Sequence, residues 1–313
     1  MKKAKIVCFG GGTGLPTLLS GLKKNPHLEI SVVVTMFDTG GSSGELKDKF
    51  GILPPGDILK CLLALSKNET ATRDLLLKRI NNYQSPGHTG GNILLLGLEK
   101  VFGSLNSAVD ALGQILSASG KVYPVTFSKS TLYARFDDGS TFKGETNIDM
   151  AIYEGKKISD LYLDPQIDAN PSVLEVIEEA DILCIGPGSF YTSVLPNFLP
   201  KGVKDKITSS KSEIIFICNL LTEGYGMKNL TVQDIVRNVE DVYIGRPISK
   251  IVVNSAIPIT RLTDYAQERK YPIYCDPDPR IVLDDLWLDS NLARHDPDRL
   301  AYLVGHLIYQ LKS

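Results

Sequence analysis

Short apolar runs alternate along the chain with segments in which apolar residues recur at helical spacing. Runs rich in valine, isoleucine and phenylalanine, typical of buried strands, lie at 5–9, 30–36, 182–185, 214–219 and 250–254. Helical spacing is found at 15–22, 58–66, 93–102, 174–180 and 232–239. Strands buried on both faces lack polar alternation, so this order predicts an α/β fold. We expect a Rossmann-like, three-layer arrangement in which helices cover both faces of a parallel sheet.

The stretch at about 121–150 departs from this alternation. Asp137-Asp138-Gly139 is a turn signal between two β-rich runs, 132–136 and 141–142, and predicts a β-hairpin. We therefore expect a β-rich elaboration of the main sheet here. Since no linker, repeat or low-complexity tract divides the chain, a single Rossmann-like domain over 1–313 is favoured.

The loop after the first predicted strand reads Gly10-Gly11-Gly12-Thr13-Gly14 and opens a helix. Its N–H groups and the helix dipole favour an anion, so Gly11, Gly12, Thr13 and Gly14 are candidate phosphate-binding residues. It is not the dinucleotide fingerprint, because Leu15 stands where the third glycine is required, and it lacks the lysine of a Walker A loop. A tight strand-to-helix turn without a ligand would also explain the glycines.

Other polar, glycine-bearing loops follow the later strands and turns. Asp38 begins the loop that follows the second strand and could accept from a ribose hydroxyl or hold a metal ion. Asp57 follows two prolines and a glycine, where a helix N-cap and a functional role are equally compatible. Because carboxyl ends of parallel strands meet at one edge, we expect a ligand site there. The further candidate ligand-binding residues are Thr39, Gly40, Ser42, Ser43, Asn92, Gly188, Ser189, Asn219, Thr222 and Glu223.

Composition narrows the function classes. The chain has 34 basic and 36 acidic residues, so bulk attraction to nucleic acid or an anionic membrane is excluded. Its 5 cysteines contain no C-x-x-C pair, which argues against a disulfide framework or a thiolate zinc site. Cys8, Cys184 and Cys218 lie in strand-like runs and are expected in the core. Without a signal-like or membrane-spanning apolar stretch, we expect a cytoplasmic protein with no membrane insertion.

These motifs together resemble the bacterial YvcK-like gluconeogenesis factors, from residue 5 to beyond 300. The residues that carry the resemblance are Gly10–Gly14, Asp38–Gly44, Pro54–Asp57, Gly91-Asn92, Gly186–Ser189 and Asn219–Glu223. The resemblance implies a CofD-like Rossmann core and binding of a UDP-sugar, such as UDP-N-acetylglucosamine or UDP-glucose. It also implies a role in cell shape and peptidoglycan supply during growth on gluconeogenic carbon sources.

The same superfamily includes the magnesium-dependent 2-phospho-lactate transferases, whose second loop is implied to carry acidic metal ligands. This sequence has Gly41-Ser42-Ser43-Gly44 there, which leaves Asp38 and Asp57 as metal candidates. We therefore expect a nucleotide-sugar-binding regulator that requires no cofactor, with a Mg²⁺-dependent transferase as the alternative. A nicotinamide-dependent dehydrogenase is suggested by the fold alone, and fold does not fix function.

Residues outside the glycine loops could complete a UDP-sugar site. Tyr191 and Tyr265 are candidates to stack on the uracil, although each could equally be a packing tyrosine. Arg294 could supply the charge that the first loop lacks, although it lies in a polar turn before a helix. The catalytic residues, if any, stay unknown, and homo-oligomers or regulatory protein partners are compatible with this interpretation.

Overall fold

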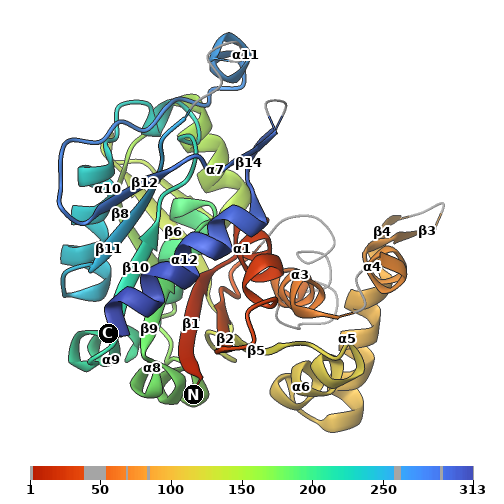
Figure 1. Ribbon diagram of the computed structural model, residues 1–313. Coiled ribbons are helices and arrows are strands. Elements are labelled where there is room, and N and C mark those ends of the chain that lie inside the picture. Colours follow the sequence, from red (N-terminus) through yellow and green to blue (C-terminus); the bar gives the residue numbers. More distant parts are fainter. Residues whose placement is uncertain are drawn as a thin grey trace.

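Figure 1 shows the computed structural model of the protein. It describes residues 3–38, 54–67, 70–82, 85–256, 262–289 and 292–312. None of the helices in these ranges is both long enough and apolar enough to cross a bilayer.

The centre of the molecule is a seven-stranded sheet in which every neighbouring pair is parallel. Its strands are β1 (Ala4–Gly10), β2 (Leu28–Val34), β5 (Gly120–Pro124), β9 (Ile182–Ile185), β10 (Glu213–Ile217), β11 (Lys250–Asn254) and β12 (Ile281–Asp284). They lie in the order β12-β11-β10-β9-β1-β2-β5. The predicted Rossmann-like α/β fold is confirmed, because each run expected to be a buried strand forms one of the inner strands.

Helices connect and cover these strands. They are α1 (Gly14–Leu22), α3 (Gly56–Leu65), α4 (Thr70–Leu77), α5 (Gly90–Phe102), α6 (Leu105–Ile115), α7 (Glu145–Glu154), α8 (Pro171–Glu179), α9 (Val203–Ser209), α10 (Val232–Asn238), α11 (Leu262–Gln267) and α12 (Pro297–Lys312). Short 3-10 or π turns lie at Phe190–Val194 (η1), Leu195–Phe198 (η2), Tyr225–Met227 (η3) and Val239–Ile244 (η4). In Figure 1, α12 runs beside α1 across one side of the sheet.

The strand order places a topological switch between β1 and β9. From β1 the chain moves outward to β2 and β5, whereas from β9 it moves the opposite way to β10, β11 and β12. Because such crossovers are right-handed, the connecting helices of the two halves cover opposite faces of the sheet. The loops after β1 and β9 therefore diverge to opposite faces and leave a crevice at the carboxyl edge, the usual ligand position in this architecture.

Three small antiparallel sheets lie outside the main sheet. The first consists of β6 (Thr131–Phe136), β7 (Thr141–Lys143) and β8 (Ile158–Asp164), and it confirms the hairpin predicted around Asp138. Its bounds differ from the expected 121–150, because β5 belongs to the main sheet and the third strand comes after α7. The others pair β3 (Arg79–Asn82) with β4 (Ser85–Thr89), and β13 (Trp287–Asp289) with β14 (Leu292–His295).

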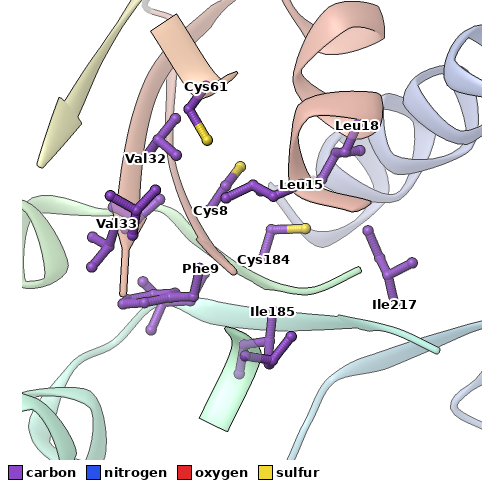
Figure 2. Packing of buried hydrophobic residues seen from close by; sticks show 14 of the residues in the cluster. Cys8, Phe9, Leu15, Leu18, Val32, Val33, Cys61, Cys184, Ile185 and Ile217 are labelled. Carbon is purple, nitrogen blue, oxygen red and sulfur yellow. The ribbon is translucent and has the colours of Figure 1, made fainter. Parts of the chain in front are cut away.

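The core lies between the sheet and its helices, as Figure 2 shows around the centre of β1. Cys8 and Cys184 are fully buried neighbours in β1 and β9, and Cys218 is also buried. All five cysteines are free thiols. The prediction that these cysteines are small core residues is confirmed, and burial raises the pKa of the Cys218 thiol to about 12.

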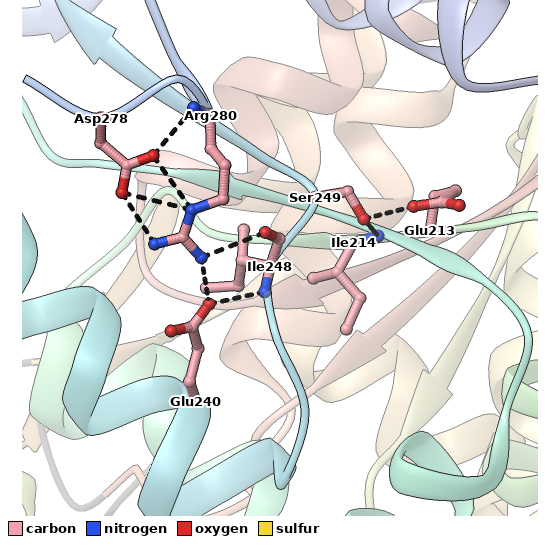
Figure 3. A network of polar contacts seen from close by, with 7 residues as sticks. All are labelled: Glu213, Ile214, Glu240, Ile248, Ser249, Asp278 and Arg280. Carbon is pink, nitrogen blue, oxygen red and sulfur yellow. Dashed lines mark hydrogen bonds and ion pairs between the residues drawn. The ribbon is translucent and has the colours of Figure 1, made fainter.

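An arginine joins the edge of the sheet to η4. Arg280 donates to Asp278 and Glu240, with Nη1 2.6 Å from Glu240 Oε1 (Figure 3). Glu240 also accepts from the backbone N–H of Ile248 at 2.6 Å, just before β11. The planar guanidinium bridges two carboxylates at fixed positions, which holds the loop before β12 against the helical turn.

Helices α1 and α12 approach closely at Gly21. A Cβ atom on Gly21 would lie 2.5 Å from the Ala301 Cβ and would overlap the backbone oxygen of Pro297. We expect Gly21→Ala to lower the free energy of unfolding by about 1–3 kcal/mol, because the α12 backbone must move. Urea denaturation would measure this change.

The matched control is Gly97→Ala in α5, where no atom lies within 4 Å of the added methyl group. Alanine should stabilise this helix by about 0.5–1 kcal/mol through its higher helix propensity. Equal effects of the two substitutions would contradict the close α1–α12 contact.

Candidate functional site

Two adjoining cavities open over the carboxyl edge of the sheet, at the switch between β1 and β9. They have volumes of about 820 Å³ and 490 Å³, and we call them the first lobe and the second lobe. The residues that line both are Gly12, Glu145, Ser189 and Glu223. The lobes therefore form one cleft at the position where this architecture binds its ligands.

The first lobe combines acidic residues with an apolar wall. Its carboxyl groups belong to Asp38, Asp57, Glu145, Asp149 and Glu223. The lysine in its lining is Lys60, and the apolar side chains are those of Leu59, Leu77, Met150, Ile152 and Tyr153. This composition suits a neutral ligand group that has both hydroxyls and a flat apolar surface.

Glu145 is the most perturbed carboxyl group of the first lobe. It begins α7 and is half-buried, and partial burial raises its pKa to about 9, with the hydrogen bond to Asp38 as the next cause. Repulsion from Asp38, Asp149 and Asp57 acts in the same direction. At neutral pH Glu145 therefore carries a proton and donates it to Asp38.

Two other carboxyl groups titrate above their usual range. Desolvation raises the pKa of Asp149 to about 6, against a hydrogen bond from Thr192. Desolvation also raises the pKa of Glu223, although hydrogen bonds from Ser189 and from the backbone N–H of Phe190 act in the opposite direction. Asp149 can therefore change charge near neutral pH.

Asp57 binds the first glycine loop. Its Oδ2 accepts from the N–H of Gly12 at 2.8 Å, and its Oδ1 lies 2.9 Å from Nζ of Lys60. Burial opposes the charge of Lys60, but attraction to Asp57 outweighs it and raises the pKa of Lys60. Since α3 begins at Gly56 after Pro55 as N-cap, Asp57 is not the N-cap that the sequence allowed.

The same carboxylate explains why position 11 is glycine. A Cβ atom on Gly11 would overlap Oδ2 of Asp57, so a larger residue would displace the carboxylate from the loop. One N–H of the predicted phosphate cradle is therefore already bonded to protein. The N–H groups that remain for a ligand are those at the start of α1, beyond Gly12.

The second lobe surrounds the start of α1 and holds two cationic side chains. Lys270 and Arg294 line it together with Thr13, Gly14 and Thr17, and with Glu145 and Glu223, which it shares with the first lobe. The exposed N–H groups of the first helical turn and the two cations favour an anion in this lobe. The sequence-based assignment of Arg294 and the first loop to one ligand group is compatible with this arrangement.

The loop after β10 is hydrogen-bonded both to the loop after β9 and to the segment after α11. Asn219 accepts from the N–H of Gly188 at 3.2 Å and donates to its oxygen at 2.8 Å. Thr222 accepts from the N–H of Tyr271 at 3.2 Å through Oγ1, while its own N–H donates to the Tyr271 oxygen at 2.8 Å. Asn219 and Thr222 both line the second lobe, and both fix the loops that shape it.

His295 lines the second lobe without adding charge. It is 6% exposed, and burial lowers its pKa to about 4, against a hydrogen bond to the backbone of Cys218. The imidazole is therefore neutral at pH 7, and Lys270 and Arg294 supply the positive charge of this lobe.

The two tyrosines proposed to stack on a uracil lie away from the lining of both lobes. Tyr265 is 2% exposed and packs on Trp287, with ring centroids 5.7 Å apart. Tyr191 lies edge-on to Phe190, with centroids 4.9 Å apart, and burial raises its pKa to about 12. The tyrosine that lines the cleft is Tyr153, at the end of α7.

Tyr153 is held by an arginine. The guanidinium carbon of Arg269 lies 4.2 Å from the centroid of the Tyr153 ring, and its Nη1 donates to the Tyr153 backbone oxygen at 2.8 Å. Tyr225 lies on the same guanidinium at 4.7 Å. These contacts fix a ring that is 40% exposed beside the first lobe.

Most candidate residues from the sequence are brought together in the cleft. Asp38, Asp57 and Asn92 line the first lobe, Ser189 and Glu223 line both lobes, and Gly188, Asn219, Thr222 and Arg294 line the second. Thr39, Gly40, Ser42 and Ser43 lie outside the described residues. The charged and aromatic lining residues that the sequence did not single out are Lys60, Glu145, Asp149, Tyr153 and Lys270.

The metal hypothesis concerns Asp38 and Asp57, which both line the first lobe. Within the described ranges, no three histidine, cysteine, aspartate or glutamate side chains are arranged to hold a metal ion together. A magnesium ion there would have to use fewer protein ligands, as Mg²⁺ commonly does when a substrate phosphate completes its shell.

The sheet and the cleft define a Rossmann-like α/β protein with a polar ligand site at the topological switch. Comparison with known families identifies it further: the chain belongs to the CofD family, described as 2-phospho-L-lactate transferase CofD, whose model matches residues 6–285. The resemblance to the YvcK-like gluconeogenesis factors is confirmed at the level of the family.

Named relatives cover nearly the whole chain. It is 35% identical over 317 residues to the gluconeogenesis factor of Bacillus subtilis, covering 98% of this chain and 99% of the relative. It is 40% identical over 312 residues to the gluconeogenesis factor of Listeria innocua, covering 96% and 94%. A crystal structure of a UPF0052 family member from Bacillus halodurans matches with a TM-score of 0.90 at 34% identity, covering 97% of this chain and 99% of that one.

Proposed function

We propose that the protein binds a UDP-sugar, UDP-N-acetylglucosamine or UDP-glucose, and acts as a regulator without turning it over. The observation that supports this most directly is the division of charge within one cleft. Two cations and helix N–H groups line the second lobe, whereas three aspartates, Lys60 and an apolar wall line the first, and Glu145 and Glu223 line both. A nucleotide-sugar combines the same two kinds of group, a charged pyrophosphate and the neutral hydroxyl-bearing and aromatic groups attached to it.

The pyrophosphate fits the second lobe. The first turn of α1 offers N–H groups beyond Gly12, and Lys270 and Arg294 line the same cavity. Helix N-termini and arginine both bind phosphate oxygens well, which compensates for the missing lysine of a Walker A loop. Asp57 keeps the phosphate away from Gly12 by occupying its N–H.

Hydroxyl groups and a flat ring fit the first lobe. The carboxyl oxygens of Asp38 and Asp57 would accept from ribose or sugar hydroxyls. Tyr153, held by Arg269, would stack on the uracil or on an apolar sugar face.

The cellular role rests on family membership. The relatives from Bacillus subtilis and Listeria innocua are named gluconeogenesis factors. We therefore propose that this chain, in the cytoplasm, supports cell shape and peptidoglycan supply during gluconeogenic growth. UDP-N-acetylglucosamine is a precursor of peptidoglycan, so a protein that senses it would connect carbon source to wall synthesis.

A Mg²⁺-dependent transferase of the 2-phospho-lactate type is the second candidate. The family description and the location of Asp38 and Asp57 in the first lobe favour it. In this case the two carboxylates would hold the ion, and the ion would neutralise charge on a transferred phosphoryl group. The two candidates differ in their requirement for metal and in the formation of product.

Isothermal titration of the purified protein with UDP-N-acetylglucosamine, UDP-glucose, GDP and NAD, with and without magnesium, tests the proposal. We expect selective binding of UDP-sugars that does not need metal, and no product on analysis of the mixtures. Binding of GDP or NAD alone, or a product that requires magnesium, would support a different function.

Tyr153 gives a local prediction for this site. Tyr153→Ala should weaken UDP-sugar binding about tenfold, because it removes the ring that lines the first lobe. Tyr153→Phe should retain the affinity, since it keeps the stacking surface. Tyr302→Ala is the matched control, because Tyr302 is 79% exposed on α12. Titration calorimetry of the three variants measures the difference, and equal losses for Tyr153→Ala and Tyr302→Ala would contradict the stacking role.

A further inference from the structure

A continuous row of four oxygen-bearing side chains leads from Asp149, which lines the first lobe, through Thr192 to Ser189 and Glu223, which line both lobes. Thr192 Oγ1 lies 3.0 Å from Asp149 Oδ1 and 2.8 Å from Ser189 Oγ. Ser189 Oγ lies 2.9 Å from Glu223 Oε2. The order Asp149–Thr192–Ser189–Glu223 therefore places two hydroxyls between two carboxyl groups, and each neighbouring pair is at hydrogen-bond distance.

Counting hydrogens shows that this row is incomplete when both carboxyl groups are ionised. Three contacts need three hydrogens, but Thr192 and Ser189 supply one each. If each hydroxyl donates to its carboxylate, the contact between the two hydroxyl oxygens has no hydrogen and their lone pairs face each other. If one hydroxyl donates to the other, one of the carboxylate contacts is left without a hydrogen instead.

A third hydrogen on either carboxyl group fills every contact. With Asp149 protonated, the donors run from Asp149 through Thr192 and Ser189 to Glu223. With Glu223 protonated, they run in the reverse direction. Rotation of the two hydroxyls together with transfer along the row exchanges these states, so one proton is shared between the ends.

We propose that the row Asp149–Thr192–Ser189–Glu223 binds one exchangeable proton, and that ligand binding in the cleft proceeds with uptake of this proton from solvent. The second half of this inference rests on the proposed binding of a phosphate-bearing nucleotide-sugar. No bond between heavy atoms changes, since the buffer gives up the proton and a carboxylate oxygen receives it. An anionic ligand that displaces water from the cleft favours the protonated row.

Charged groups around the row change the stability of its carboxylates, some favouring the protonated form and some the ionised form. Asp38 and Glu223 repel a negative charge on Asp149, while Lys270 attracts the charge on Glu223. Glu145, Asp57, Lys60 and Tyr153 also line the first lobe, and Arg294 and His295 line the second lobe with Glu223. Because Glu145 shares its own proton with Asp38, the row is a second and separate proton site.

Carboxyl ¹³C NMR of the ligand-free protein tests the proton itself. We expect the resonances of Asp149 and Glu223, assigned with Asp149→Asn and Glu223→Gln, to shift together in a common step above the usual carboxyl range. Thr192→Val removes one of the two hydroxyls of the row, and Ser189→Ala removes the other. Each substitution should separate the titration of Asp149 from that of Glu223. Thr192→Ser keeps a hydroxyl and should preserve the common step. Separate midpoints in the unaltered protein would overturn the shared proton.

Titration calorimetry with UDP-N-acetylglucosamine tests the coupling. At pH 7, in buffers with different ionisation enthalpies, we expect uptake of up to about one proton per ligand, and affinity that falls by up to about tenfold per pH unit above this. Thr192→Val should reduce the uptake, and Thr192→Ser should retain it. Binding without proton uptake would overturn the coupling. Absence of UDP-sugar binding would refute the proposed ligand and with it the coupling, whereas the NMR titration would still decide on the shared proton.

Discussion

Gly14→Ala is expected to weaken UDP-sugar binding at least about 100-fold, or by about 3 kcal/mol. A Cβ atom at this position would lie 2.7 Å from the nitrogen of Gly188 and 2.8 Å from the oxygen of Pro187. Both are backbone atoms, and Gly188 is held on both sides by Asn219. The loops after β1 and β9 would have to separate, which displaces the helix N–H groups from the second lobe.

The affinity of Gly14→Ala is measured by calorimetry on protein whose fold is checked by circular dichroism. Gly97→Ala is the control for a glycine-to-alanine change in a helix, because its methyl group meets open space. It should bind with unaltered affinity. If Gly14→Ala is folded and binds the UDP-sugar with the affinity of the wild type, this would contradict the assignment of the pyrophosphate to the start of α1.

Glu145→Gln is expected to stabilise the protein by about 1–3 kcal/mol at pH 8–9. The pKa of Glu145 is raised to about 9 by partial burial and by Asp38, whereas an unfolded glutamate ionises near its model value of 4.5. Between these values the unfolded chain releases a proton that the folded chain keeps, so stability falls as pH rises. Glutamine stays neutral at all pH values and removes this loss.

Urea denaturation of the wild type and of Glu145→Gln from pH 5 to pH 9 measures how their difference in stability changes with pH. We expect the stability of Glu145→Gln to exceed that of the wild type by a margin that grows with pH. Glu179→Gln is the control, because Glu179 is exposed and its pKa is lowered by Lys5. A margin that shrinks with rising pH would show that Glu145 is ionised in the folded protein.

The architecture could be predicted from the sequence because it follows from local patterns. The runs at 30–36 and 182–185 lack polar alternation, and this absence is what burial on both faces of a parallel sheet produces. The loops after these strands had to meet at one edge. Therefore Asp38, Ser189 and Glu223 could be expected near one another although they lie far apart in the sequence.

Other parts of the cleft could not be predicted because their local patterns are those of ordinary surface helices. Glu145 and Asp149 lie four residues apart in a polar helix that follows a hairpin. Nothing in that segment indicates that the small antiparallel sheet carries α7 over the cleft. The one available signal was that this segment lies between two glycine loops in the sequence. That position also fits a solvent-exposed helix.

The tyrosines illustrate the same limit. Tyr265 and Tyr153 both lie in helices that contain polar as well as apolar residues, and the sequence cannot say which ring faces a cavity. The structure buries Tyr265 against Trp287 and leaves Tyr153 on the cleft wall beneath Arg269. Side-chain orientation depends on how the small sheets sit on the main sheet, and these contacts are long-range.

The most direct test of the proposed UDP-sugar site is a crystal structure of the protein with UDP-N-acetylglucosamine, grown without divalent metal. We expect the pyrophosphate in the second lobe, within hydrogen-bond distance of the first N–H groups of α1 and of Arg294. The rest of the ligand should extend past Glu223 toward Tyr153. Phosphates bound in the first lobe against Asp38 and Asp57, or ordered there only after magnesium is added, would contradict it.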